Sequence, residues 1–410
     1  MKQTYTPSDK ILEKYAKLIV GFGLRNRNGS KPKKGSVVLF NVPEVAKPLY
    51  YHLQRAIVQA GYNPIGNFIP SPERKYNFEE AYYKDASEAQ LQFCPYKKYK
   101  GLIDEIDCSI HIIAQTNPHA LTSVDPKKVL KHSQAQKKIS DLRREKINKG
   151  KLNWTIALYG TDAMAHEAGL TPRQYWNQII HACYLDKKDP IAQWEKINDT
   201  VQNTAKKLTD LKIKSVRIEG KDMDITIGIG KNRKWAAGGG NNIPSYEVFT
   251  SPMWQEVNGW ARLNQPHYRY GKKIEGIELW FEKGKVVKSK ASKNHNLLKS
   301  MLSTPGGNKL GEFSLTDMRL SRINKFMAEI LYDENIGGKY GNTHIALGSS
   351  FRECYKGKIN PKWTEKDWNK LGFNNSVVHS DIISTTNRTV TATLYNGDEK
   401  IIYRDGKFTI

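Results

Sequence analysis

Residues 35–70 read GSVVLFNVPEVAKPLYYHLQRAIVQAGYNPIGNFIP. The segment 35–42 is a short apolar run after a basic turn, which is typical of a buried strand. In 44–60 the apolar residues recur at four-residue steps, which predicts a helix, and Gly61 stands where a C-cap glycine belongs. A second strand is predicted over 62–69. This order of strand, helix and strand indicates an α/β fold.

Two further apolar runs extend this pattern along the chain. The segments 106–114 (IDCSIHIIA) and 154–159 (WTIALY) are both predicted to be strands. Strands that alternate with helices usually form a mostly parallel sheet whose two faces are covered. We therefore expect residues 1–185 to form an N-terminal α/β domain.

A strongly basic segment, 126–151, lies between these two runs and contains ten Lys or Arg and two acidic residues. Its apolar residues form an imperfect helical stripe, so the segment is predicted to be a helix with a solvated basic face. We favour this interpretation over a dedicated nucleic-acid element, because no aromatic residue interleaves with these lysines to stack on bases.

The composition excludes several classes of protein. The 410 residues are 39% hydrophobic and 10% aromatic, which supplies core material for two domains and excludes a disordered chain. No apolar run reaches the length of about eighteen residues that a membrane span requires. The N-terminus lacks the apolar region of a signal peptide, and the four cysteines follow no metal or disulfide spacing. We therefore expect a cytoplasmic protein with no membrane partner.

The net charge of +24 is the most conspicuous feature of the composition and arises from 65 Lys or Arg against 41 Asp or Glu. Such an excess permits phosphate binding, because each neutralised phosphate releases counterions. Net charge alone bears on association and solubility, not on fold or reaction. We expect nucleic acid to bind only non-specifically, through the basic surface.

The second half of the chain is richer in strands and follows a polar helical linker at 186–210. Alternation over 223–229 predicts a half-buried strand, and 274–287 reads as a hairpin. The segment 315–331 is predicted to be a helix. Residues 186–410 are therefore expected to form a C-terminal β-rich, metal-binding domain, so that the fold class is α/β plus α+β.

Six polar residues of the second half lie in unusual local settings. Taken singly, Glu247, Glu312 and Glu334 are explained by an exposed loop, the N-terminal charge of a helix and ordinary loop polarity, respectively. A lone histidine in an apolar run, such as His344, is more often a core residue than a ligand. Together the set is more informative, and in chain order it comprises Glu247, Glu312, Glu334, His344, His379 and Asp381.

His379 and Asp381 give the sharpest local signal. They lie in the alternating segment SVVHSDII, so a strand there points both side chains to the same face. Such a pair either binds a divalent metal ion or is a surface pair, and the motif alone leaves both open. With four carboxylates and two imidazoles, the full set suits a two-metal hydrolytic site, where metal ions polarise a carbonyl and activate water.

The order of these motifs resembles that of the aminopeptidase T family of metallopeptidases, often called thermophilic aminopeptidases. The first half of the chain is looser but compatible, so the resemblance covers essentially the whole chain. The strings that carry it occur in the family's order: Asn242-Ile243-Pro244, Glu247-Val248-Phe249-Thr250, Gly284-Lys285-Val286-Val287, Leu310-Gly311-Glu312, Leu331-Tyr332-Asp333-Glu334-Asn335, His344-Ile345-Ala346-Leu347-Gly348 and NSVVHSD at 375–381.

The resemblance implies an enzyme that removes the N-terminal residue of a peptide substrate. It implies two divalent metal ions per subunit, usually zinc or cobalt, with magnesium and manganese as further options, and it implies all six residues above as their ligands. Glu312 is our first choice for the carboxylate that bridges the two ions and acts in catalysis. The family also implies a homodimer whose active sites face an enclosed cavity.

The sequence departs from the family pattern in three places. The family carries a tyrosine seven residues after the histidine of His-x-Ala-x-Gly, as a ligand or a transition-state donor, whereas this chain has Phe351, which can be neither. Tyr355, four residues further on, is the candidate replacement as a catalytic residue. About five residues around 337–341 are inserted before that histidine, and Tyr246 precedes Glu247, where the family usually has a small or acidic residue.

Two hypotheses of function remain open on the sequence. The leading one is a metal-dependent aminopeptidase of reduced activity, since the loss of one such donor typically costs about 100–1,000-fold in rate without abolishing the reaction. The alternative is a weakened or inactive family member that acts as a metal-binding or peptide-binding protein.

Overall fold

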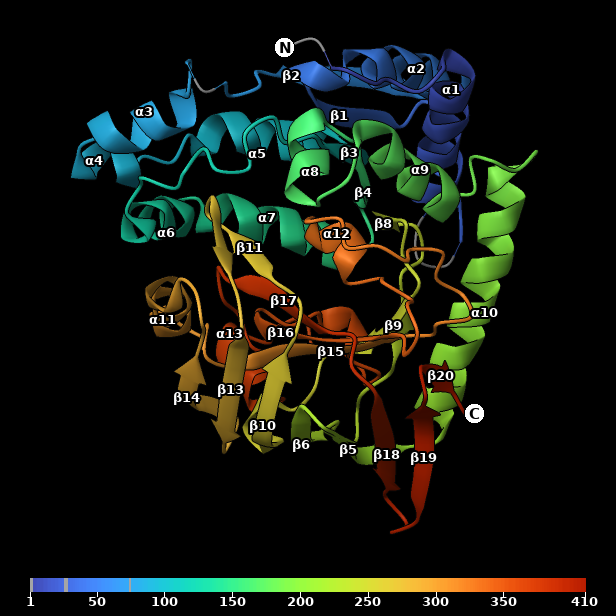
Figure 1. The fold of residues 1–410 in the computed structure, drawn as a ribbon, viewed down its shortest axis with the longest axis vertical. Helices are drawn as coiled ribbons and strands as arrows, with labels where there is room; N and C mark the ends of the chain where they lie inside the picture. The colour runs from blue at the N-terminus through green and yellow to red at the C-terminus, as the bar shows by residue number, and fades with distance from the viewer. Residues whose placement is uncertain (1–2, 26–28, 74) are drawn as a thin grey trace. The chain divides into compact units, whose positions relative to one another are not determined.

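The computed structural model describes residues 3–25, 29–73 and 75–410, and Figure 1 shows the path of the chain. These residues form two compact units. The first unit runs to Asn198 and includes the later segments Gly238–Ser245 and Phe326–Tyr332, whereas the second comprises Asp199–Ala237, Tyr246–Lys325 and Asp333–Ile410. The domain boundary between residues 185 and 186 stays a prediction.

The first unit is built around a five-stranded parallel sheet with the strand order β2-β1-β3-β4-β8. Val38, Phe40 and Ile110 are completely buried, because helices cover the faces of such a sheet. The four strands predicted for the first half are confirmed, and a short fifth strand joins them. The strands are β1 (Val37–Pro43), β2 (Asn63–Ile69), β3 (Cys108–Ile113), β4 (Asn153–Leu158) and β8 (Asn242–Ile243).

Helices connect these strands. The helix predicted over 44–60 is confirmed, whereas the one predicted over 126–151 is two helices that meet at Gln136. No helix in the described residues is long and apolar enough to cross a membrane. The helices are α1 (Asp9–Leu18), η1 (Ile19–Gly23), η2 (Glu44–Ala46), α2 (Lys47–Gln59), α3 (Phe78–Asp85), α4 (Glu88–Gln92), α5 (Tyr96–Glu105), α6 (Pro126–Ala135), α7 (Lys137–Asn148), α8 (Asp162–Glu167) and α9 (Pro172–Ala182).

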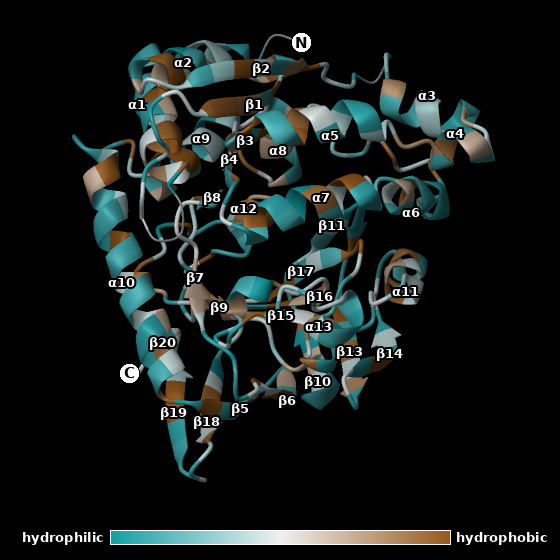
Figure 2. Ribbon diagram, turned by 180° about the vertical axis from the view of Figure 1, so that it is seen from behind, coloured by the Kyte–Doolittle hydropathy of each residue, from teal (hydrophilic) through white to brown (hydrophobic). Residues whose placement is uncertain are grey.

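The predicted polar linker is confirmed as α10 (Pro190–Asp210), which is coloured largely hydrophilic in Figure 2. The boundary between the two units falls inside this helix, after Asn198. The glycine-rich segment 238–240, before Glu247, lies close to another part of the backbone, because a Cβ on Gly240 would lie 2.9 Å from the carbonyl oxygen of Phe22.

The larger sheet of the second unit has eight strands in the order β14-β13-β10-β6-β5-β18-β19-β20, and its neighbours are antiparallel. The predicted hairpin is confirmed: Lys283 and Gly284 have φ angles of 46° and 78°, as a type I′ turn requires. The strands are β5 (Ile213–Gly220), β6 (Met223–Gly228), β10 (Val257–Leu263), β13 (Ile277–Glu282), β14 (Lys285–Lys290), β18 (Arg388–Leu394), β19 (Glu399–Arg404) and β20 (Lys407–Phe408).

A second antiparallel sheet of this unit has the order β17-β16-β15-β9-β7. The predicted fold class, a parallel α/β part followed by a β-rich part, is therefore confirmed. The strands are β7 (Ala236–Ala237), β9 (Glu247–Thr250), β15 (Leu310–Thr316), β16 (Asn342–Gly348) and β17 (His379–Ser384). The remaining elements are β11 (His267–Arg269), β12 (Lys272–Ile274), η3 (Trp254–Glu256), α11 (His295–Ser303), α12 (Ile330–Asp333), η4 (Arg352–Cys354) and α13 (Glu365–Lys370).

The helix predicted over 315–331 is wrong. Its first residues belong to β15, and only the single turn α12 is helical at its end. The carboxylate of Asp317 explains the difference, because its oxygens accept hydrogen bonds from the backbone N–H of Arg319 at 2.9 Å and of Phe408 at 3.0 Å. An aspartate that captures nearby backbone donors in this way competes with helix formation.

The two faces of β15 differ in chemistry. Leu310, Phe313 and Leu315 are completely buried and belong to the main hydrophobic core of the second unit. Glu312 and Ser314 alternate with them and are also buried, so they point to the opposite face. The strand thus packs one row of side chains into the core and carries a row of polar side chains on its other face.

We expect Phe313→Ala to destabilise the protein by about 3–5 kcal/mol, because it removes a completely buried ring from the core. Urea unfolding monitored by circular dichroism measures this change. Phe78→Ala is the matched control, since Phe78 is 44% exposed and its loss should cost less than about 0.5 kcal/mol. Equal effects of the two substitutions would contradict this account of β15.

Candidate metal centre

Four adjacent strands of the smaller sheet carry five of the predicted ligands. In the antiparallel ladder, Glu312 of β15 lies opposite Ala346, which lies opposite Asp381 of β17. Thr316, on the same face as Glu312, lies opposite Glu247 of β9. Because directly opposed residues share a face, the register gathers on one side of the sheet Glu247, Glu312, His344, His379 and Asp381.

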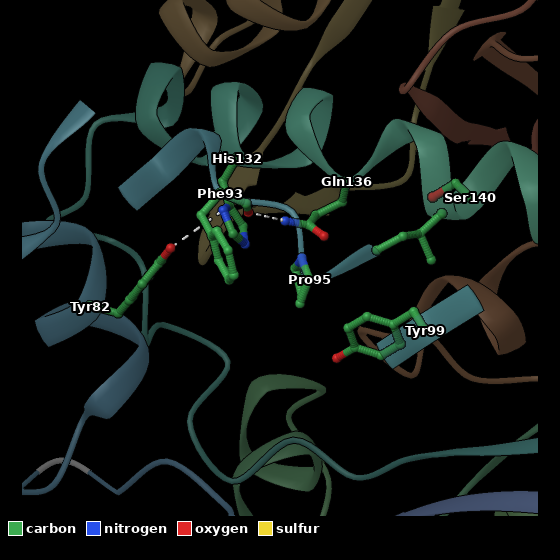
Figure 3. Close-up of a pocket in the computed structure, with 8 residues that line it drawn as sticks. Tyr82, Phe93, Pro95, Tyr99, His132, Gln136 and Ser140 are labelled. Atoms are coloured by element: carbon green, nitrogen blue, oxygen red, sulfur yellow. Dashed lines mark hydrogen bonds between the residues drawn. The ribbon is translucent and has the colours of Figure 1, made fainter. Parts of the chain in front are cut away.

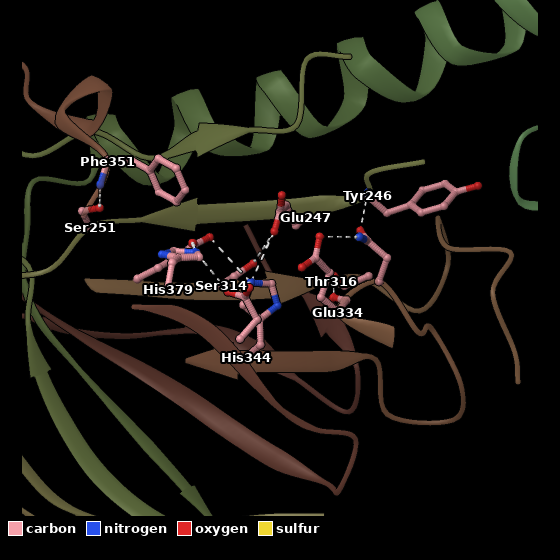
Figure 4. A network of polar contacts seen from close by, with 12 residues as sticks. Tyr246, Glu247, Ser251, Ser314, Thr316, Glu334, His344, Phe351 and His379 are labelled. Atoms are coloured by element: carbon pink, nitrogen blue, oxygen red, sulfur yellow. Dashed lines mark hydrogen bonds and ion pairs between the residues drawn. The ribbon is translucent and has the colours of Figure 1, made fainter. Parts of the chain in front are cut away.

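The two imidazoles lie close to carboxylate oxygens, and Figure 4 labels both rings together with Glu247 and Glu334. His344 Nε2 is 3.4 Å from Glu247 Oε2 and 3.6 Å from Glu312 Oε1. His379 Nε2 is 3.3 Å from Glu312 Oε2 and 3.3 Å from Asp381 Oδ1. The two oxygens of Glu312 therefore face different imidazoles.

Glu334 reaches the same place from outside the sheet. It directly follows α12, is buried, and has an oxygen within 4.8 Å of ligand atoms of His344 and Asp381. The Asn335 side chain donates to Glu334 Oε1 at 3.4 Å and accepts from the backbone N–H of Tyr246 at 2.6 Å. Asn335 thus links the segment that carries Glu334 to the start of β9.

The donor set fits divalent cations. Four buried carboxylates against two imidazoles leave an excess of negative charge that is costly to bury unless a cation offsets it. Carboxylate oxygen and imidazole nitrogen are ordinary ligands of zinc and related ions. Within the described residues, the groups that are close enough to hold an ion are Glu247–Glu312–His344, Glu312–His379–Asp381 and Glu334–His344–Asp381.

Without a cation, protons bind in the cluster instead. Burial lowers the pKa of His344, but its hydrogen bond to Glu312 and the carboxylate charges outweigh burial and raise that pKa to about 9. The pKa of His379 also lies well above its ordinary value. Burial lowers this pKa, but the charge of Asp381 outweighs burial and raises it. For Glu312, burial raises the pKa, but hydrogen bonds from both imidazoles lower it overall. Near neutral pH both imidazoles of the metal-free protein are protonated.

A backbone hydrogen bond on the far side of the ring fixes the orientation of His379. Its Nδ1 donates to the backbone carbonyl of Ser349 at 2.9 Å, which leaves Nε2 directed at the carboxylates. A backbone acceptor of this kind is a common support for a metal-binding histidine. The ring of Phe351 lies 5.0 Å from the His379 ring in an edge-on arrangement, and Figure 4 shows it beside the cluster. At this place the chain therefore offers an apolar ring and no hydroxyl.

Tyr355 lies in an aromatic cluster. Its ring centroid is 5.5 Å from that of Trp363, 5.6 Å from that of Trp368 and 6.1 Å from that of Phe373. A Cβ on Gly357 would lie 2.3 Å from the Tyr355 hydroxyl, so this hydroxyl lies against the Gly357 backbone. The catalytic role of Tyr355 stays a prediction.

Two supporting residues were not predicted from the sequence. Ser314 Oγ donates to Glu247 Oε2 at 3.4 Å, and His267 makes a hydrogen bond to the backbone of Asp381. Burial and the nearby charge of Arg269 lower the pKa of His267 to about 4, so it is neutral. Strand alternation through Glu312 would have identified Ser314, whereas no local signal connects His267 with a strand so distant along the chain.

Known proteins resemble this chain along nearly its whole length. A family model described as thermophilic metalloprotease (M29) matches residues 8–408. Aminopeptidase T of Thermus aquaticus is 27% identical over 344 residues, which cover 79% of this chain and 82% of that protein. Aminopeptidase PepS of Streptococcus thermophilus is 24% identical over 97% of this chain and 98% of its own length. The solved structure of wild-type AmpT from Thermus thermophilus matches with a TM-score of 0.80 at 25% identity, covering 98% of this chain and 99% of that one.

We expect zinc binding to the metal-free protein to release protons near neutral pH, because a ligand imidazole must be neutral and His344 has a pKa of about 9. Apparent zinc affinity should therefore rise as the pH increases toward that value. Calorimetric titration in buffers of different ionisation enthalpy measures the number of protons released. His344→Asn should reduce this number, and binding heats that do not depend on the buffer would contradict the expectation.

Proposed function

The chain belongs to the thermophilic metalloprotease family M29, and we propose that it is a metal-dependent aminopeptidase that hydrolyses the N-terminal residue from peptides. Relatives from five organisms are named as aminopeptidases and match most of this chain, including aminopeptidase 2 of Geobacillus stearothermophilus at 25% identity over 98% of it. The family and these relatives favour an enzyme over the alternative of an inactive binding protein.

The observation that best supports a two-metal centre is the position of Glu312. One of its oxygens faces His344 and the other faces His379, and Glu312 belongs to two of the three candidate ligand groups. A carboxylate in this position suits a bridge between two cations. We propose that Glu247 and His344 would hold one cation together with Glu312, and that His379 and Asp381 would hold the other, with Glu334 as a further ligand.

Both the bound cations and side chains of the protein would contribute to hydrolysis. Bound divalent cations polarise the scissile carbonyl and lower the pKa of water. A nearby carboxylate that is not bound to cations through both oxygens would carry a proton from water to the leaving amine. An acidic side chain near the cations would also hold the α-ammonium group of the substrate. Peptide approaches past His379, because its side chain is 29% exposed whereas that of His344 is 1% exposed.

Several finer features belong to the same proposal. We propose zinc or cobalt as the ions, with magnesium or manganese as further options, because the ligand set combines oxygen with imidazole nitrogen. We also propose a homodimer in the cytoplasm, in accordance with the family resemblance and with cysteines that are all free.

Glu312→Gln should weaken the binding of both ions, because it takes away the carboxylate whose two oxygens face the two imidazoles of different ligand groups. We expect the purified protein to contain about two zinc or cobalt ions per subunit and to hydrolyse leucyl and arginyl anilides, and the variant to lose both properties. Elemental analysis and anilide turnover measure them. Glu282→Gln, at an exposed carboxylate, is the matched control. Less than one ion per two subunits, with no turnover after zinc or cobalt is added, would refute the proposal.

Phe351→Tyr should raise kcat on the order of 100-fold if the rest of the centre is intact, because it supplies a hydroxyl beside His379. Steady-state hydrolysis of leucyl anilide measures the gain. Tyr355→Phe separates the two candidate donors: a loss of similar size would assign the function to Tyr355. No gain in the first variant would show that this position does not limit the rate.

A further inference from the structure

A basic and aromatic surface lies on the first unit, and its residues are far in the sequence from those of the candidate metal centre. Helix α5 begins Tyr-Lys-Lys-Tyr-Lys at 96–100, and all five side chains are exposed. In the sequence of 126–151 alone, lysines have no aromatic neighbours, and for that reason we predicted a simple solvated helix. The structure changes this interpretation, because aromatic residues of 82–99 lie beside α6 and α7.

These aromatic residues line an open groove of about 510 Å³, which Figure 3 shows. Tyr82, Phe93 and Tyr99 are 40%, 66% and 39% exposed, so their rings are available to a ligand. No Asp or Glu is among the residues that line it, which are Tyr82, Phe93, Pro95, Tyr99, His132, Gln136, Ile139 and Ser140.

The groove is held in shape by hydrogen bonds between its two walls. Gln136 Nε2, at the junction of α6 and α7, donates to the backbone carbonyl of Phe93 at 2.9 Å. Lys128 Nζ donates to the carbonyl of Tyr83 at 2.6 Å. The Tyr82 and His132 rings lie 5.4 Å apart and edge-on. The exposed rings are therefore presented on a fixed frame and do not depend on a ligand for their placement.

Exposed cations flank the groove on both walls. Lys98 directly precedes the lining residue Tyr99 on α5, with its Nζ 5.8 Å from the centre of the Tyr99 ring, and Lys138 directly precedes the lining residue Ile139 on α7. Among the residues that the structure describes, these two lysines make no ion pair, unlike Lys137, which pairs with Asp141. The surface therefore offers unpaired positive charge beside stacking rings.

We propose that this groove binds single-stranded nucleic acid, with bases stacked on Tyr82, Phe93 and Tyr99 and phosphates beside the flanking lysines. Exposed aromatic rings in a positively charged groove are the usual elements of sequence-tolerant single-strand binding. A second copy of the chain is disfavoured as occupant, because it would bring the same positive charge against this surface. The proposal is independent of the metal centre and of the peptidase activity.

The test is fluorescence anisotropy with a labelled oligothymidylate of about twelve nucleotides, using the full-length, metal-loaded protein at about 50–200 mM salt. The double variant Phe93→Ala/Tyr99→Ala should weaken binding at least about tenfold. Tyr51→Ala/Tyr395→Ala removes two other exposed rings and is the matched control, with binding unchanged. Lys98→Ala/Lys138→Ala should reduce the salt dependence of binding, by a slope of about one per lysine.

Three further arms give outcomes that would overturn the proposal. Equal binding of a duplex of the same length would show attraction by charge alone. If the aromatic double variant lost affinity for a polyglutamate peptide by as much as it lost affinity for the oligonucleotide, the groove would be assigned to acidic protein segments instead. A change of oligomeric state in that variant, measured by size-exclusion chromatography with light scattering, would make the groove an interface between copies of the chain. Circular dichroism spectra and melting curves like those of the unaltered protein show that all variants are folded.

Discussion

The burial of three carboxylates on one face of a β-sheet, together with a fourth from the segment after α12, is the constraint on which the candidate centre depends. Such a face is unstable unless each negative charge meets a proton, a hydrogen-bond donor or a cation. In the metal-free protein the two imidazoles supply protons, which is why the pKa of His344 rises to about 9. The same arrangement is ready for divalent cations, since loss of those protons leaves oxygen and nitrogen donors that already face one another.

The sheet holds these charges in place because one of its faces packs into the hydrophobic core while the other carries the polar side chains. The rows that include Phe313 and Leu315 are fixed in the hydrophobic core, so the backbone that carries Glu312 cannot move away from its neighbours. On the polar face the residues between the ligands are small, such as Ser314 and Ala346. Small side chains there leave space above the strand for ions and substrate.

Local patterns in the sequence predicted the parts of the structure that depend on local interactions. The parallel strands and the His379-Ser380-Asp381 strand follow from apolar runs and alternation, and both are present. The helix predicted over 315–331 fails because Asp317 bonds to Phe408, a contact that no local window contains. For the same reason, the local sequence suggested that Glu312 is the N-terminal charge of a helix, and it did not reveal the aromatic side chains that lie beside α6 and α7. The ligand set itself came from the order of motifs and the family resemblance, because spacing along the chain does not give proximity across four strands.

The chain passes between the two units several times, and this affects how the protein unfolds and loses its ions. The chain leaves the first unit for the last two times at 245/246 and 332/333, each within two residues of a candidate ligand, Glu247 and Glu334. No single cut can therefore release either unit whole. Melting of the first unit would also loosen two of the segments that bear carboxylates, although none of the six candidate ligands belongs to that unit. Heat inactivation and loss of bound ions would then occur as one event, and a peptidase half excised on its own would be a poor metal binder.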